Sequence, residues 1–259
     1  VVRDGQDFWD WYTRCLVGDP KFVRDIVARK SFSKLRSALA GLYANRGKPA
    51  DAEKAYQQAR LLYPLSPEAT FRYVQEVLMR QRRFDDSLRL MKEFKTQDPG
   101  NRKVDPFVEH LEKVKNLTDR IRALESKRRE GKIDLNSALQ LAELYRQAGQ
   151  KGTSVQMLRQ IMATPKLDYR VFLRVAALFA RAEQYEDMDR ALQMFLQRKP
   201  ANLKNPKILL NIAQLYMRAK NSARMSEVLA EYLKQRPDDW KAWIDQAGLL
   251  MRMGKKKQA

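Results

Sequence analysis

The sequence predicts an all-α protein built as a solenoid of short helix–turn–helix pairs, interrupted by one long helix. Residues that lose little rotamer freedom in a helix dominate the chain of 259 residues: Ala, Leu, Arg, Lys, Gln and Glu. Only ten glycines and ten prolines occur, and the prolines stand mostly between periodic segments. A pattern of small and large apolar residues also returns about every 34 residues, which is typical of stacked helical repeats.

The repeat is clearest at a small residue that a large residue follows three positions later. Ala40 is followed by Tyr43, and Ala142 by Tyr145. The small residue lets a neighbouring helix approach closely, and the large residue fills the space beside it. The pattern returns in Ala176 with Phe179, Ala213 with Tyr216, and Ala247 with Leu250.

Two intervals between the large residues are longer than 34 residues. Leu78, the large residue of the second unit, follows Tyr43 by 35 residues. Tyr216 follows Phe179 by 37 residues. We assign the extra residue of the first to the turn at Pro67. Those of the second coincide with the loop at 203–205.

This period and pattern resemble the tetratricopeptide repeat, a helix–turn–helix unit of 34 residues. The resemblance implies a right-handed α-solenoid whose first helices line a concave groove. We therefore expect five parts: N-terminal capping helices at 1–32, two units at 33–101, a long connecting helix or degenerate repeat at 102–134, three units at 135–239, and a truncated sixth unit at 240–259.

Three parts of this division have alternative interpretations. The first part is rich in aromatic residues around Trp9 and Trp11; it caps the first repeat or lies at a membrane interface, which Trp and Tyr favour. The long helix is a spacer that buries its apolar stripe or a coiled-coil partner site. The last unit would expose Trp243, Ala247 and Leu250, which suggests a piece of a longer protein or self-association there.

The sequence contains no pattern typical of a catalytic or metal site. A Gly-rich phosphate loop, a paired Cys or His metal motif and a nucleophile elbow are all missing from it. The single cysteine, Cys15, excludes an internal disulfide. We therefore expect no enzyme, no cofactor and no metal.

A formal net charge of +20 favours acidic proteins, anionic lipids or nucleic acids as partners. In the tetratricopeptide resemblance, the second, sixth, ninth and thirteenth residues of each unit face the groove. In the second unit these include Tyr73, Glu76 and Arg80, and in the third Asn136 and Glu143. Toward the C-terminus the predicted ligand contacts become mainly basic: Arg170, Arg174, Arg181, Lys207, Asn211, Gln214, Arg218 and Lys241.

These residues favour a non-catalytic protein–protein interaction scaffold whose basic groove takes an acidic peptide or partner, because guanidinium groups pair with carboxylates. The chaperone-tail clamp of the family is disfavoured, since only Asn211 and Lys241 match its five positions. Single-stranded RNA is also disfavoured, because Tyr73 is the only aromatic residue among the groove positions. The alternative is a basic, membrane-proximal regulatory domain that binds an anionic surface.

A second resemblance involves residues 32–43, with Phe32, Leu35, Arg36 and Tyr43. Together with the aromatic segment before it, this stretch looks like the repeat tail of certain large bacterial multi-pass membrane proteins of glycosyltransferase type. That resemblance implies a catalytic part upstream of Val1. The sequence by itself assigns no compartment.

Overall fold

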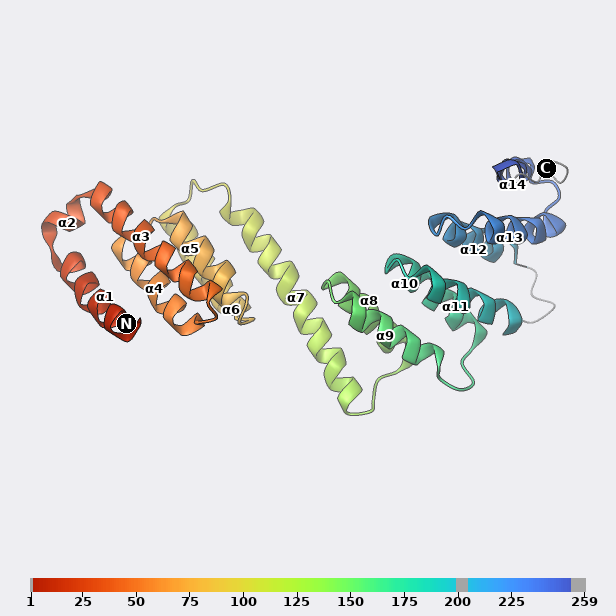
Figure 1. Ribbon diagram of the computed structural model, residues 1–259, viewed down its shortest axis with the longest axis horizontal. Coiled ribbons are helices and arrows are strands. Elements are labelled where there is room, and N and C mark those ends of the chain that lie inside the picture. The colour runs from red at the N-terminus through yellow and green to blue at the C-terminus, as the bar shows by residue number, and fades with distance from the viewer. Residues whose placement is uncertain (1, 199–204, 253–259) are drawn as a thin grey trace. The chain divides into compact units, whose positions relative to one another are not determined.

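The computed structural model of the chain describes residues 2–198 and 205–252 (Figure 1). All regular structure in this part of the chain is helical, which confirms the predicted all-α fold class. The chain divides into two compact units, one up to Asn116 and one from Leu117 onward, and the boundary falls inside a long helix. None of the described helices is long and apolar enough to cross a membrane.

The first unit contains a short helical corner followed by two helix pairs. Its elements are α1 (Val2–Gly18), α2 (Pro20–Arg24), α3 (Ile26–Asn45), α4 (Pro49–Leu62), α5 (Pro67–Tyr73), the π-helix η1 (Val74–Leu78), α6 (Phe84–Gln97) and the first half of α7 (Val104–Arg129). The core gathers large side chains from the pairs and from α7, among them Tyr56, Leu78, Phe94 and Leu111.

The turns of the helical corner are set by two aspartates. Asp19 accepts a hydrogen bond from the backbone N–H of Lys21 at the start of α2, and Asp25 accepts one from Ala28 at the start of α3. Because Asp25 caps it, α3 begins at Ile26 and runs through Ser33, the residue at which we expected the first repeat to start.

The extra residue in front of Leu78 lies inside a helix and not in the turn at Pro67. In α8, α10 and α12 the large residue of the repeat follows the N-cap by eleven positions, whereas Leu78 follows its cap, Ser66, by twelve. The helix absorbs this residue as the single π-turn η1, in which the N–H of Met79 donates to the carbonyl of Val74 at 2.8 Å. The expected insertion at the turn is therefore wrong.

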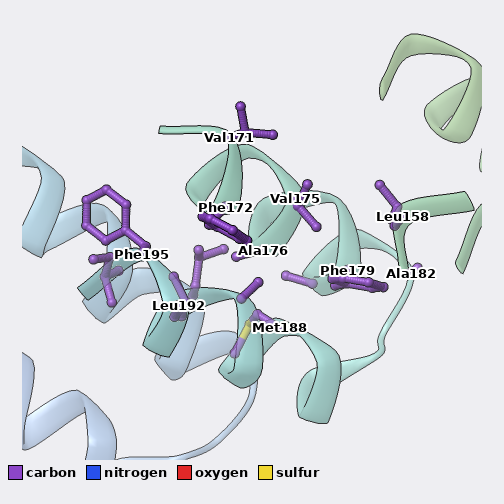
Figure 2. Close-up of a cluster of buried hydrophobic side chains, with 14 of the residues drawn as sticks. Leu158, Val171, Phe172, Val175, Ala176, Phe179, Ala182, Met188, Leu192 and Phe195 are labelled. Carbon is purple, nitrogen blue, oxygen red and sulfur yellow. The ribbon is translucent and has the colours of Figure 1, made fainter. Parts of the chain in front are cut away.

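The second unit contains the rest of α7, three helix pairs and a final helix. These are α8 (Leu135–Gln147), α9 (Lys151–Met162), α10 (Tyr169–Arg181), α11 (Tyr185–Arg198), α12 (Pro206–Arg218), α13 (Ser222–Gln235) and α14 (Trp240–Arg252). Within the pair α10 and α11, Phe172 and Phe179 of the first helix lie beside Met188, Leu192 and Phe195 of the second (Figure 2). The loop at 203–205, to which we assigned three extra residues, falls almost wholly on residues outside the described part.

Every helix pair turns at the same repeat position, four residues after its large residue. The backbone there is left-handed, with φ between 54° and 76°, and the next N–H donates to the carbonyl of the large residue, which closes the end of the first helix. These left-handed residues are Gly47, Arg82, Gly149, Glu183 and Lys220.

The last helix differs from the expectation at Leu250, which is buried, and at Ala247, which is half-buried. Trp243 is half exposed, as predicted, but Leu250 is only 8% exposed. The exposed apolar residues of this helix are Trp240, Trp243, Ile244 and Met251. The expected end of the sixth unit at 253–259 lies outside the described residues.

Candidate interaction site

The eight predicted contact residues all lie on first helices of the second unit, and all have exposed side chains. Arg170, Arg174 and Arg181 belong to α10, Lys207, Asn211, Gln214 and Arg218 to α12, and Lys241 to α14. Four of them meet in one cleft between neighbouring first helices.

This α10–α12 cleft has a volume of about 300 Å³. Its floor is apolar and consists of Leu173 and Ala177 from α10 and Leu215 from α12. The polar side chains along it are Arg174, Asn211, Gln214 and Arg218. Leu215 is buried because it also packs into the core of the unit, so the floor is part of the fold.

The arginines of the α10–α12 cleft carry charge that no described carboxylate neutralises. Arg174 donates from Nη1 to the side-chain oxygen of Asn136 at 2.6 Å, a neutral partner. Arg218 makes no side-chain hydrogen bond or ion pair with the described residues, and neither do the amides of Asn211 and Gln214. A guanidinium without an acidic partner is free to bind a ligand carboxylate.

A second cleft of about 310 Å³ lies between α8 and α10, and a carboxylate stands in it beside two arginines. Glu143 stands in it and lies 3.5 Å from Arg181 and 2.8 Å from Arg146. Hydrogen bonding from Arg146 holds the pKa of the Glu143 carboxyl below its ordinary value, so this acid stays ionised. Arg181 therefore faces an acid of its own chain, in contrast to Arg218.

Three of the predicted contacts lie outside both clefts. Arg170 donates to the hydroxyl of Tyr169 at 3.2 Å and stacks over the same ring. Lys241 lies over the ring of Trp240, at 5.6 Å from its centre. Lys207 has no side-chain partner among the described residues.

In the first unit, Tyr73 was predicted to face the groove, but it is buried. Its hydroxyl donates to Glu53 at 2.6 Å, while Arg72 takes the neighbouring position and pairs with Glu76. The reason is the π-turn: the extra residue comes after Tyr73, so the residues before it keep the ordinary repeat register and the prediction was shifted by one.

The structure also contains a polar network that the sequence analysis missed. The guanidinium of Arg36 is fully buried, donates to the side chains of Gln58 at 2.7 Å and Gln6 at 2.6 Å, and lies 4.9 Å from the ring centre of Trp9. It thereby joins α1 to the pair α3 and α4. The signal was the helical spacing that puts Arg36 on the same face of α3 as Ala40.

The described residues contain no group of three or more side chains able to hold a metal ion.

Comparison with known proteins gives structural matches alone. Neither a protein-family model nor a curated protein sequence matches the chain. Among solved structures, the chain is similar to a thermophilic tetratricopeptide repeat protein of Thermus thermophilus (16% identity, 85% of this chain and 99% of that one, TM-score 0.32). It is also similar to one from Parabacteroides merdae (14%, 88% and 76%, TM-score 0.31) and to YrrB, described as having an unusual peptide-binding site (10%, 80% and 88%, TM-score 0.33). The fold assignment rests on the helix pairs themselves.

Proposed function

We propose that the chain is a non-catalytic scaffold that binds an acidic segment of a partner protein in the α10–α12 cleft. The observation that supports this proposal is an open apolar cleft edged by Arg174 and Arg218, neither of which has an acidic partner among the described residues. Clefts between packed helices with an apolar floor and a few polar groups are common ligand sites.

An acidic ligand fits the charge of the site and of the chain. The net charge of +20 raises the local concentration of acidic partners and speeds their association, and a guanidinium pairs with a carboxylate through two parallel hydrogen bonds. In this proposal Arg174 and Arg218 make the main contacts. Arg181, which lies 3.5 Å from the carboxylate of Glu143, contributes less, and Arg170, Lys207 and Lys241 act through longer-range attraction.

The test is capture from a lysate of the source organism at about 0.15 M salt, where exposed charges are screened beyond roughly 8 Å. The variant Arg174→Glu/Arg218→Glu reverses the charge of the cleft. Its matched control is Arg190→Glu/Lys234→Glu, which changes the net charge equally on α11 and α13, outside the cleft. A partner whose acidic segment binds the native chain and the control, but not the cleft variant, supports the proposal. Equal loss in both variants contradicts it.

A second candidate function, binding to an anionic lipid surface, has an observation of its own in the first unit. The corner formed by α1, α2 and α3 exposes four apolar side chains, and Val27 is 74% exposed. Exposed cations lie between them, while the nearby aspartates are occupied as helix caps. The residues of this corner are Val17, Val23, Ile26, Val27, Lys21 and Arg24.

Basic residues near an anionic membrane contribute about 1 kcal/mol each, and the apolar tips would enter the interface. The test is co-sedimentation with phosphatidylserine vesicles of the native chain, the variant Ile26→Ser/Val27→Ser, and the control Leu35→Ser/Leu42→Ser, which removes exposed leucines from the same helix. Selective loss with the corner variant supports this function. Equal sedimentation of all three proteins contradicts it.

A further inference from the structure

We infer that the α10–α12 cleft selects a ligand in which one apolar side chain stands between two acidic residues about three positions apart. This inference rests on the proposed function and names the chemistry of the segment that the cleft takes. It follows from the floor of the cleft and from where the charges stand along it.

The floor provides a place for a side chain that avoids water. Leu173, Ala177 and Leu215 present carbon atoms to a cleft of about 300 Å³. Apolar cavities of about 150 Å³ hold a molecule the size of benzene, so a leucine or phenylalanine side chain fits in this volume. A ligand made of acidic residues alone would leave this floor uncovered or would have to desolvate a polar group over it, which is unfavourable.

Arg174, which donates to the neutral side chain of Asn136, and Arg218 stand toward opposite ends of this floor. Equivalent residues of α10 and α12 line the cleft together, Arg174 with Asn211 and Ala177 with Gln214, so the two helices run in the same direction and in register. Arg218 is seven residues further along α12 than Asn211, the residue level with Arg174. At about 1.5 Å per residue, this places the two arginines roughly 10 Å apart along the helix axes.

That separation defines the spacing of the ligand's acids. An extended chain rises about 3.3 Å per residue, so roughly 10 Å corresponds to about three residues. Two carboxylates at this spacing reach Arg174 and Arg218 at once, and a residue between them lies over the apolar floor. The free amides of Asn211 and Gln214 lie beside the same path and are available to the ligand's backbone.

The neighbouring α8–α10 cleft does not offer the same combination. It has a similar volume and shares Arg174 and Ala177, but Glu143 stands in it and pairs with Arg181. An acidic ligand in that cleft would be repelled by the carboxylate of Glu143, which already pairs with arginines of its own chain. Selection for an acidic segment with an apolar centre therefore belongs to the α10–α12 cleft.

The experiment uses fluorescence anisotropy with three labelled peptides and the full chain at about 0.15 M salt. The first peptide has two glutamates, a leucine and two glutamates; the second has serine in place of leucine; the third has lysines in place of the glutamates. We expect the leucine peptide to bind at least about tenfold more tightly than the serine peptide, and the lysine peptide not to bind.

Two variants connect this preference with the cleft. Ala177→Gln puts a polar side chain over the floor at a partly exposed helical position, and we expect it to remove the preference for leucine over serine. Arg218→Gln should weaken both glutamate peptides and leave the preference in place. Circular dichroism of each variant shows whether its helices are intact.

The outcomes separate this inference from the proposed function. Equal affinity of the leucine and serine peptides for the native chain overturns the inference and leaves acidic-segment binding intact. A leucine preference that persists in a folded Ala177→Gln variant also overturns it, because the selectivity would then lie elsewhere. If neither glutamate peptide binds, both the inference and the proposed function fail.

Discussion

Arg36 is one of the residues that attach the N-terminal helix α1 to α3 and α4. Its guanidinium is 0% exposed and is held by two glutamine side chains and the face of Trp9, all on or facing α1 and α4. Truncation to alanine removes the hydrogen bonds of this charged group and leaves a cavity where the large side chain was packed. Its burial could not be predicted from composition, because arginines are nearly always exposed.

We predict that Arg36→Ala lowers the free energy of unfolding of the first unit by about 2–4 kcal/mol. Urea denaturation followed by tryptophan fluorescence measures the change, since Trp9 lies beside Arg36. The matched control is Lys34→Ala, an exposed position on the same helix without a side-chain partner among the described residues. Equal stability of the two variants would contradict the structural role of the network.

Tyr145 makes the stability of the second unit depend on pH in the alkaline range. Burial and the hydrogen bond that its hydroxyl donates to Glu125 at 2.7 Å raise its pKa from 10.0 to about 12. The pKa in the folded state is thus above that in the unfolded state, so this contribution to stability is full below pH 10 and is lost as the pH rises toward 12. The melting temperature of the native chain should therefore approach that of Tyr145→Phe between pH 10 and pH 12. A constant difference over this range would refute the assignment.

At the scale of elements, the helix pairs share one left-handed turn residue. This residue is glycine in some repeat units and carries a side chain in others. Gly47 and Gly149 adopt positive φ at no steric cost, whereas Lys220 adopts φ 54° with a side chain. Lys220→Gly should therefore raise the free energy of unfolding by about 0.5–1 kcal/mol. The control Lys234→Gly, inside α13, should lower it by about 1 kcal/mol. Thermal unfolding measures both, and destabilisation by Lys220→Gly would be inconsistent with the turn.

The position of the inserted residue in the π-turn η1 can be tested by deletion. Deleting Gln75, an exposed residue of η1, restores the repeat spacing and brings Leu78 to the ordinary position after the cap Ser66. We expect this deletion to keep the helical content and to change the melting temperature by only a few degrees. Deleting Gln140 from the regular helix α8 rotates Leu141 and Tyr145 by about 100° and should unfold the pair. If the two deletions are equally harmful, η1 is not the site of the insertion.

The sequence was sufficient for the helix pairs but not for the exact register of one helix. The small and large residues of each pair, such as Ala142 and Tyr145, predicted the buried face because packing alone determines it. An extra residue can be absorbed in a turn or in a π-turn, and the spacing is the same in both cases. Tyr73 was therefore assigned the register position that Arg72 occupies in the structure. Similarly, charge counting could not show that Glu143 pairs with Arg181, because that depends on how two helices face each other.

At the scale of the whole molecule, we expect ligand binding to depend on the second unit alone. The α10–α12 cleft lies wholly in the second unit, whereas the Arg36 network and the exposed apolar corner lie in the first. We predict that Arg36→Ala, measured well below its melting temperature, leaves the affinity for the glutamate–leucine peptide unchanged within about twofold. A larger loss in the folded variant would mean that the first unit takes part in binding.

The most direct test of the central claim is the location of the bound peptide on the folded chain. Backbone amide chemical shifts of the deuterated protein would be followed during titration with the glutamate–leucine peptide. We expect the largest shift changes within α10 and α12, around Arg174, Ala177, Asn211 and Arg218. Changes concentrated in α1 or α7, or spread evenly over exposed lysines and arginines, would contradict it.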